Sequence, residues 1–136
     1  MTTVSVPAAS PPKAMIWAGW IVTLVVTAFL VMDGTMKVMQ LPVVTSATTE
    51  LGYDTGIIFP LGLTILAIAA LYAIPRTAVL GAILMTGLYG GTVATHLMAG
   101  NPLFSHMLFG VYLGVMAWGG LWLRDARIRA LIPFRG

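Results

Sequence analysis

Four long apolar runs occupy most of the 136-residue chain, and they limit its fold more than any other feature. The runs cover residues 14–32, 57–74, 77–98 and 103–123. A helix needs about 20 apolar residues to cross the hydrocarbon core of a bilayer, and each run is close to that length. No run alternates apolar and polar residues with a period of two, which excludes a transmembrane barrel. The sequence therefore predicts an all-α integral membrane protein.

The links between the last three runs are short. Pro75-Arg76 joins the second run to the third, and residues 99–102 join the third to the fourth. Short links keep sequence neighbours antiparallel and side by side. We predict an antiparallel four-helix bundle over residues 14–123, with a flexible tail before it (1–13) and a basic cytoplasmic tail after it (124–136). The first run is long for a signal peptide and no small-residue cleavage site follows it, so a retained helix is favoured.

The connection from residue 33 to residue 56 is too long for a structureless loop in a compact domain. We expect the first helix to continue to about Gln40 and to break near Pro42. A short surface helix over residues 43–53 would follow, with Val44, Ala47 and Leu51 as its apolar face.

Positive charges gather on one side of the predicted bundle. With four spans, both termini and the Pro75-Arg76 turn share a side, and that side holds every lysine and arginine except Lys37. Cytoplasmic loops are rich in these residues, so both termini are expected in the cytoplasm of a bacterial inner-membrane protein. The topology and lipid anchors expected at this face are Arg76, Arg124, Arg127, Arg129, Trp17, Trp20, Trp118 and Trp122. For the arginines of the tail, docking of a cytoplasmic partner is the alternative role.

The few polar residues within the spans gather at the other, outer end. At about 100° per residue, three polar side chains of the third run share one stripe. His106 of the fourth run is predicted to lie at a similar depth in the membrane. Asp33 and Lys37, one turn apart, lie at the end of the first helix. Polar groups inside a membrane usually face the bundle interior and mark a site. The candidate ligand-binding residues are Asp33, Lys37, Tyr89, Thr92, His96 and His106.

Each of these features also has a structural explanation. Asp33 and Lys37 would form an interfacial ion pair worth a few tenths of a kcal/mol, and His96 or His106 would be anchored at the interface. Glycines 87, 90 and 91 lie on the stripe opposite His96 and are expected to be a close-packing surface. The same glycines would suit self-association.

Several cofactors and partners are not expected. The chain has no cysteine, which excludes a disulfide, an iron–sulfur cluster and a thiolate zinc site. The two histidines lie on adjacent antiparallel helices, whose axes are about 8–10 Å apart, too close for a haem between them. No His-x-x-His or Glu-x-x-His spacing supports another metal site. The positive charges are explained by topology, so nucleic acid is not an expected partner.

Four short motifs resemble the DoxX-like family of small bacterial membrane proteins. They are Asp33-Gly34 with Lys37, Leu51-Gly52-Tyr53, Pro75-Arg76-Thr77, and Gly90-Gly91 through His96. The resemblance extends over about residues 14–133 and implies a four-helix bundle. It also raises the expectation of quinone chemistry, because the wider grouping takes its name from subunits of a quinone-reducing thiosulfate oxidoreductase. Other relatives are accessory factors, and most have no assigned reaction.

Two functions remain open from the sequence. In the first, the outer polar residues line a pocket for a small amphiphile such as a quinone, and the protein is the membrane part of a redox system. Lys37, Tyr89 and His96 would donate hydrogen bonds, and Asp33 or His106 would pass protons. In the second, the protein is a non-catalytic membrane subunit or assembly factor for a partner complex. The expected partners are the lipid bilayer, another membrane or redox subunit, and further copies of the chain. A small-solute permease fits less well, since internal repeats and broken helices are absent from the sequence pattern.

Overall fold

The computed structural model describes residues 12–100 and 108–132. Within these ranges every regular element is helical, as the apolar runs predict. The elements are α1 (Lys13–Val38), α2 (Pro42–Glu50), the 3-10 turn η1 (Thr55–Ile57), α3 (Ile58–Ala73), α4 (Ala78–Met98), α5 (Phe109–Arg124) and α6 (Ala126–Leu131). Three helical stretches in the described part are long and apolar enough to cross a bilayer: Lys13–Val38, Thr55–Ala73 and Ala78–Met98. These helices indicate a membrane protein in a lipid bilayer. The start of the fourth apolar run lies outside the described residues.

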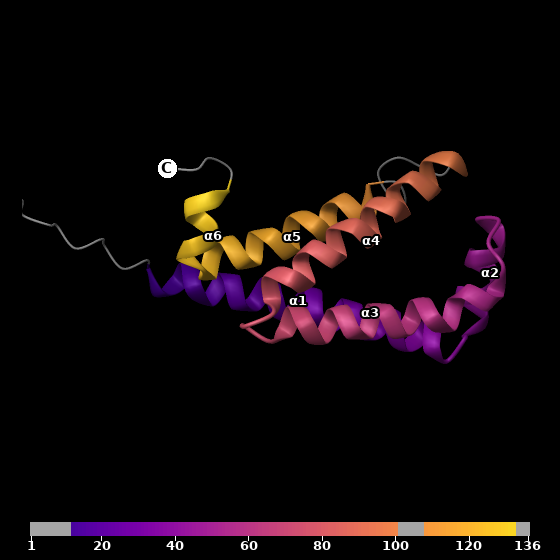
Figure 1. Ribbon diagram of the computed structural model, residues 1–136, viewed down its shortest axis with the longest axis horizontal. Coiled ribbons are helices and arrows are strands. Elements are labelled where there is room, and N and C mark those ends of the chain that lie inside the picture. Colours follow the sequence, from indigo (N-terminus) through magenta and orange to yellow (C-terminus); the bar gives the residue numbers. More distant parts are fainter. Residues whose placement is uncertain (1–11, 101–107, 133–136) are drawn as a thin grey trace, which may run out of the picture.

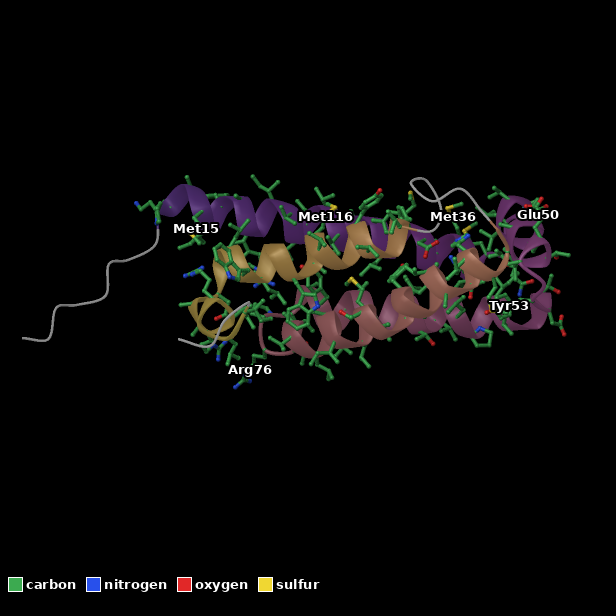
Figure 2. All side chains as sticks on the ribbon, turned by 90° about the horizontal axis from the view of Figure 1, so that it is seen from above. Met15, Met36, Glu50, Tyr53, Arg76 and Met116 are labelled. Atoms are coloured by element: carbon green, nitrogen blue, oxygen red, sulfur yellow. The ribbon has the colours of Figure 1, made fainter. Side chains whose placement is uncertain are left out.

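The long helices form two pairs that diverge toward one end of the molecule. α1 packs against both α3 and α5, and α4 packs against both α5 and α3; the two pairs are α1 with α3 and α4 with α5. Figure 1 shows the two pairs close together at the end that carries α6 and apart at the end that carries α2. We refer to these as the α6 end and the α2 end. Figure 2 shows Met36, Glu50 and Tyr53 at the α2 end and Met15 and Arg76 at the opposite one.

Glycines bring the helices into close contact at the α6 end. A Cβ built on Gly81 of α4 would lie 2.6 Å from the backbone nitrogen of Tyr72 in α3. One built on Gly19 of α1 would lie 2.8 Å from the carbonyl oxygen of Gly120 in α5. Tyr72 is fully buried, and its hydroxyl donates to the carbonyl of Ala117 at 2.7 Å. The α6 end is therefore fixed by close backbone contacts and by a buried hydrogen bond between α3 and α5.

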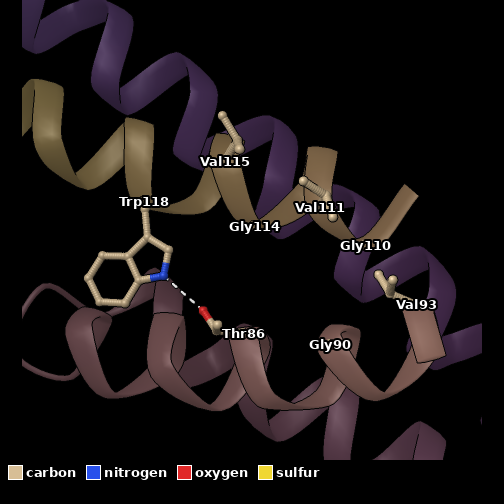
Figure 3. Close-up of a pocket in the computed structure, with 8 residues that line it drawn as sticks. All are labelled: Thr86, Gly90, Val93, Gly110, Val111, Gly114, Val115 and Trp118. Carbon is tan, nitrogen blue, oxygen red and sulfur yellow. Dashed lines mark hydrogen bonds between the residues drawn. The ribbon is translucent and has the colours of Figure 1, made fainter. Parts of the chain in front are cut away.

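The glycine stripe of α4 does not pack as the sequence predicted. Within the described part of the chain, no atom lies within 4 Å of a Cβ built on Gly87, Gly90 or Gly91. The predicted close-packing surface is therefore wrong for contacts inside that part of the chain, where the three glycines leave open space. Gly90 instead lines a groove of about 290 Å³ between α4 and α5, shown in Figure 3. The indole N–H of Trp118 donates to the hydroxyl of Thr86 at 2.8 Å beside this groove.

Arg124 ties α5 to α1 at the α6 end. Its guanidinium carbon lies 4.1 Å from the ring centre of Trp20, and its Nε donates to the hydroxyl of Thr23 at 3.1 Å. A cation over an indole face is attracted by the ring quadrupole. The predicted anchors Arg124 and Trp20 thus also bind each other.

α6 is held by the residues at its two ends. The side chain of Asp125 accepts from the backbone N–H of Arg127 at 2.9 Å, and the two side chains form an ion pair at 3.2 Å. Arg129 donates to the carbonyls of Trp122 and Leu123 at 2.7 and 3.0 Å. No further turn of α5 supplies N–H donors to these last carbonyls, so Arg129 caps α5 while belonging to α6.

The cap at Asp125 makes α6 sensitive to acid. The hydrogen bond and charge of Arg127 hold the pKa of Asp125 below its ordinary value of 3.8. A carboxyl group whose pKa is lower in the folded than in the unfolded state stabilises the folded state at pH values above its unfolded-state pKa. This stabilisation is lost as the pH falls through the folded-state pKa. Hydrogen-exchange protection of α6, corrected for intrinsic rates, should be constant from neutral pH to about pH 5 and fall below pH 3.8.

Two substitutions test this expectation. Asp125→Ala should lower α6 protection at pH above about 5, by about the 1 kcal/mol typical of a lost N-cap, and the difference from wild type should shrink below pH 3.8. Asp125→Asn should keep much of the protection and lose its pH dependence, because an amide oxygen still accepts the Arg127 N–H. If α6 protection in Asp125→Asn depends on pH as it does in the wild type, a group other than Asp125 causes the pH dependence.

Candidate functional site

A cavity of about 610 Å³ lies between the diverging helix pairs at the α2 end. This is within the usual range of roughly 300–1,000 Å³ for small-molecule sites. Its walls are mainly apolar and come from α1, α2, α3, α4 and the first residue of α5. The apolar lining residues are Phe29, Met36, Val43, Val44, Ala47, Leu51, Ile57, Leu61, Ile65, Leu88, Gly91 and Phe109.

Five predicted ligand-binding residues line this cavity: Asp33, Lys37, Tyr89, Thr92 and His96. The first two come from α1 and the other three from α4. The helical phase of residues 89, 92 and 96 therefore does turn one stripe of α4 toward the cavity. The sixth candidate, His106, lies outside the described residues.

Asp33 connects the polar groups of the two helix pairs. Its Oδ1 lies 2.5 Å from the Nζ of Lys37, and its Oδ2 accepts a hydrogen bond from the hydroxyl of Tyr89 at 3.3 Å. Tyr89 is buried, and the side chains of Lys37 and Asp33 are only 18% and 21% exposed. Both carboxylate oxygens thus have partners, and the pair adds no net charge to the cavity. Such a wall suits an uncharged polar group better than an ion.

Close contacts at glycine set the position of these side chains. A Cβ on Gly62 of α3 would lie 2.9 Å from both the carbonyl of Gly34 and the Cβ of Lys37, so α1 and α3 touch at the level of the ion pair. A Cβ on Gly110 of α5 would lie 2.6 Å from the carbonyl of Tyr89 in α4. Each half of the polar group is therefore held within its own helix pair, and the Tyr89–Asp33 bond joins the halves.

Three polar residues at the cavity were missed from the sequence: Thr48, Tyr53 and Thr95. The hydroxyls of Tyr53 and Thr95 lie 2.9 Å apart, which links the segment after α2 to α4. Thr95 follows Thr92 by three residues, so the same helical stripe could have included it. Tyr53 lies outside any helix, and no periodicity could have assigned it to the cavity.

Two further observations concern the described residues around the cavity. Among residues 12–100 and 108–132, no three histidine, aspartate or glutamate side chains gather closely enough to hold a metal ion. On the side between α1 and α5, the rings of Phe29 and Phe109 lie with centroids 5.2 Å apart and close that wall. The geometry is that of an apolar chamber with hydrogen-bonding groups on one side.

Comparison with known proteins gives one match. The model of the DoxX-like family matches residues 21–120, which include every lining residue of the cavity. No curated protein and no solved structure matches the chain.

Proposed function

The chain belongs to the DoxX-like family, and from this premise we propose that its cavity at the α2 end binds a small, uncharged amphiphile. A quinone is the best candidate, with the protein as the membrane part of a redox system. The observation that carries the proposal is the joining of a mainly apolar chamber to one cluster of intramembrane polar groups, Asp33, Lys37, Tyr89, Thr92 and His96.

A quinone matches this chamber group by group. Its ring and isoprenoid tail are apolar, and its two carbonyl oxygens accept hydrogen bonds. The ammonium of Lys37 has three N–H donors, of which the contact with Asp33 uses one, so it can also donate to a carbonyl. His96, on the facing helix, is the candidate donor to the second carbonyl. Reduction to the quinol takes two electrons and two protons. The electrons come from a redox partner, and histidine can pass protons near neutral pH.

The proposed membrane arrangement has four spans. α5, together with the residues before it, is the fourth span, which makes α1, α3, α4 and α5 an antiparallel four-helix bundle. Both termini and Arg76 then lie on the cytoplasmic side of a bacterial inner membrane, and the cavity opens near the outer surface. Arg127 and the tryptophans of the α6 end lie at the cytoplasmic interface, where lipid head groups and aromatic side chains meet.

A second candidate is a non-catalytic membrane subunit or assembly factor. The groove in Figure 3 favours it, since Gly90 and Gly114 leave room on one face of α4 and α5 for a helix of another protein. Under this alternative, truncation after Leu123 or bulky residues in the groove would impair function more than any change in the cavity.

Mass spectrometry of organic extracts separates the two candidates. Detergent-purified wild-type protein should carry close to one equivalent of a quinone or another uncharged lipid. His96→Ala should retain less than about a tenth of it, a loss expected when one good hydrogen bond to a buried ligand group is removed. Gly87→Ala, on the same helix but away from the cavity, is the matched control and should retain the full amount. Wild-type protein without bound lipid, or equal lipid retention in His96→Ala, would favour the accessory-subunit function over ligand binding.

A further inference from the structure

Among the described residues, a hydrogen bond between Tyr53 and Thr95 connects α4 to the segment that joins α2 to α3, and both side chains line the cavity. We propose that the bond between Tyr53 and Thr95 controls an opening through which water-soluble molecules reach the cavity. The identity of the molecule that uses this opening rests on the proposed function, whereas the opening itself does not.

The backbone holds Tyr53 in one place. Gly52 has φ +86°, a left-handed conformation that favours glycine, and it ends α2. The N–H of Gly52 donates to the carbonyl of Thr49 at 2.9 Å, and the N–H of Tyr53 donates to the carbonyl of Thr48 at 3.2 Å. On the other side, Asp54 caps η1 by accepting from the N–H of Gly56 at 3.1 Å. With caps before and after it, Tyr53 can leave Thr95 by side-chain rotation alone.

The direction of the hydrogen bond follows from the partners of Thr95. The hydroxyl of Thr95 donates its one proton to the carbonyl of Gly91 at 3.0 Å. It can therefore only accept from Tyr53, whose hydroxyl donates across 2.9 Å. The tyrosine ring lines the cavity and is also 46% exposed, so it lies at the boundary between the cavity and the surface.

This contact is weaker than two other described contacts across the cavity, Tyr89–Asp33 and Phe29–Phe109. The Tyr89–Asp33 bond involves a carboxylate and a buried ring, and a hydrogen bond to a charged group is stronger than a neutral one. The Phe29–Phe109 contact buries apolar surface that would have to be exposed. The Tyr53–Thr95 bond joins two neutral hydroxyls in contact with solvent, where water replaces either partner at little cost. Thermal opening is therefore expected there first.

The absence of cysteine from the chain provides a direct test. Ile65→Cys places one thiol on the cavity wall, at a position only 2% exposed. The probe is a permanently charged methanethiosulfonate, 2-(trimethylammonium)ethyl methanethiosulfonate, added to the full chain in dodecylmaltoside. Intact-protein mass spectrometry measures the rate at which the thiol is labelled. Leu61→Cys serves the same purpose if the first variant does not fold.

Adding Tyr53→Phe should increase the labelling rate about two- to tenfold, as expected for the loss of one neutral hydrogen bond. The matched control is Tyr112→Phe. Tyr112 is 45% exposed, against 46% for Tyr53, and does not line the cavity, so its replacement should leave the rate unchanged. An unchanged rate in Tyr53→Phe, an equal increase in Tyr112→Phe, or no labelling in either cysteine variant would overturn the proposal.

The two proposals fail separately. Faster labelling in Tyr53→Phe together with empty extracts would support the opening and reject the bound amphiphile. Unchanged labelling, with a lipid that His96→Ala loses, would support the amphiphile and reject this route.

Discussion

Gly81→Ala should destabilise the protein by about 1–3 kcal/mol, the usual cost of an added methyl group in a tightly packed contact. The new Cβ would lie 2.6–2.9 Å from the N, Cα and Cβ atoms of Tyr72. The nearest two are backbone atoms of α3, so a side-chain rotation cannot relieve the clash. Tyr72 also donates to Ala117, so displacement of α3 would strain the buried bond to α5 as well.

Gly87→Ala is the control for this substitution, in the same helix and with the same change in chemistry. Its Cβ meets no atom within 4 Å in the described chain. Alanine is the better helix former, so stability should be unchanged or higher by up to about 1 kcal/mol. Denaturant titration in mixed micelles, followed by circular dichroism, compares both variants with wild type. Equal effects at the two positions would mean that α3 and α4 are not in close contact at Gly81.

Lys37→Met should destabilise the protein more than Asp33→Asn, although both remove the same ion pair. The methionine leaves a carboxylate whose remaining described partner is the hydroxyl of Tyr89, at a cost of about 1–3 kcal/mol. Asp33→Asn instead leaves the ammonium of Lys37, which lies one residue from the end of α1. A long lysine side chain can extend to interfacial water.

The double variant Asp33→Asn/Lys37→Met completes the thermodynamic cycle. Since it leaves no charge at either position, it should recover most of the stability lost in Lys37→Met. The same micelle titration gives the coupling energy, expected to be about 1 kcal/mol or more. A coupling near zero would identify the pair as an ordinary exposed ion pair, which typically contributes almost nothing.

Most of the helical structure could be predicted because the bilayer limits the choices. A long apolar run has few alternatives to a helix, and the breaks come at residues with a clear physical effect. Pro42 opens α2 as its first residue, and the Pro75-Arg76 turn lies between α3 and α4. The stripe of Tyr89, Thr92 and His96 could also be placed from helix geometry, since all three lie on a single helix.

Contacts between distant helices could not be predicted in this way. Gly81 and Gly87 are the same residue type on the same helix, and only the rotation of α4 against α3 decides which of them packs. The bond from Tyr89 to Asp33 joins residues 56 positions apart. The Tyr53–Thr95 bond depends on a turn at Gly52, and hydrophobic periodicity does not predict turns. Periodicity fixes the faces of each helix, whereas the pairing of those faces is a property of the whole bundle.

The divergence of the two helix pairs gives the molecule a wedge shape, narrow at the α6 end and wide at the α2 end (Figure 1). In the proposed membrane arrangement such a body would take up more area in one leaflet than in the other. The lateral pressure of the wider leaflet would act to push the pairs together, and the proposed opening at Tyr53 would have to form against it. Lipid composition in that leaflet would then change, through packing pressure alone, the rate at which a thiol in the cavity is labelled.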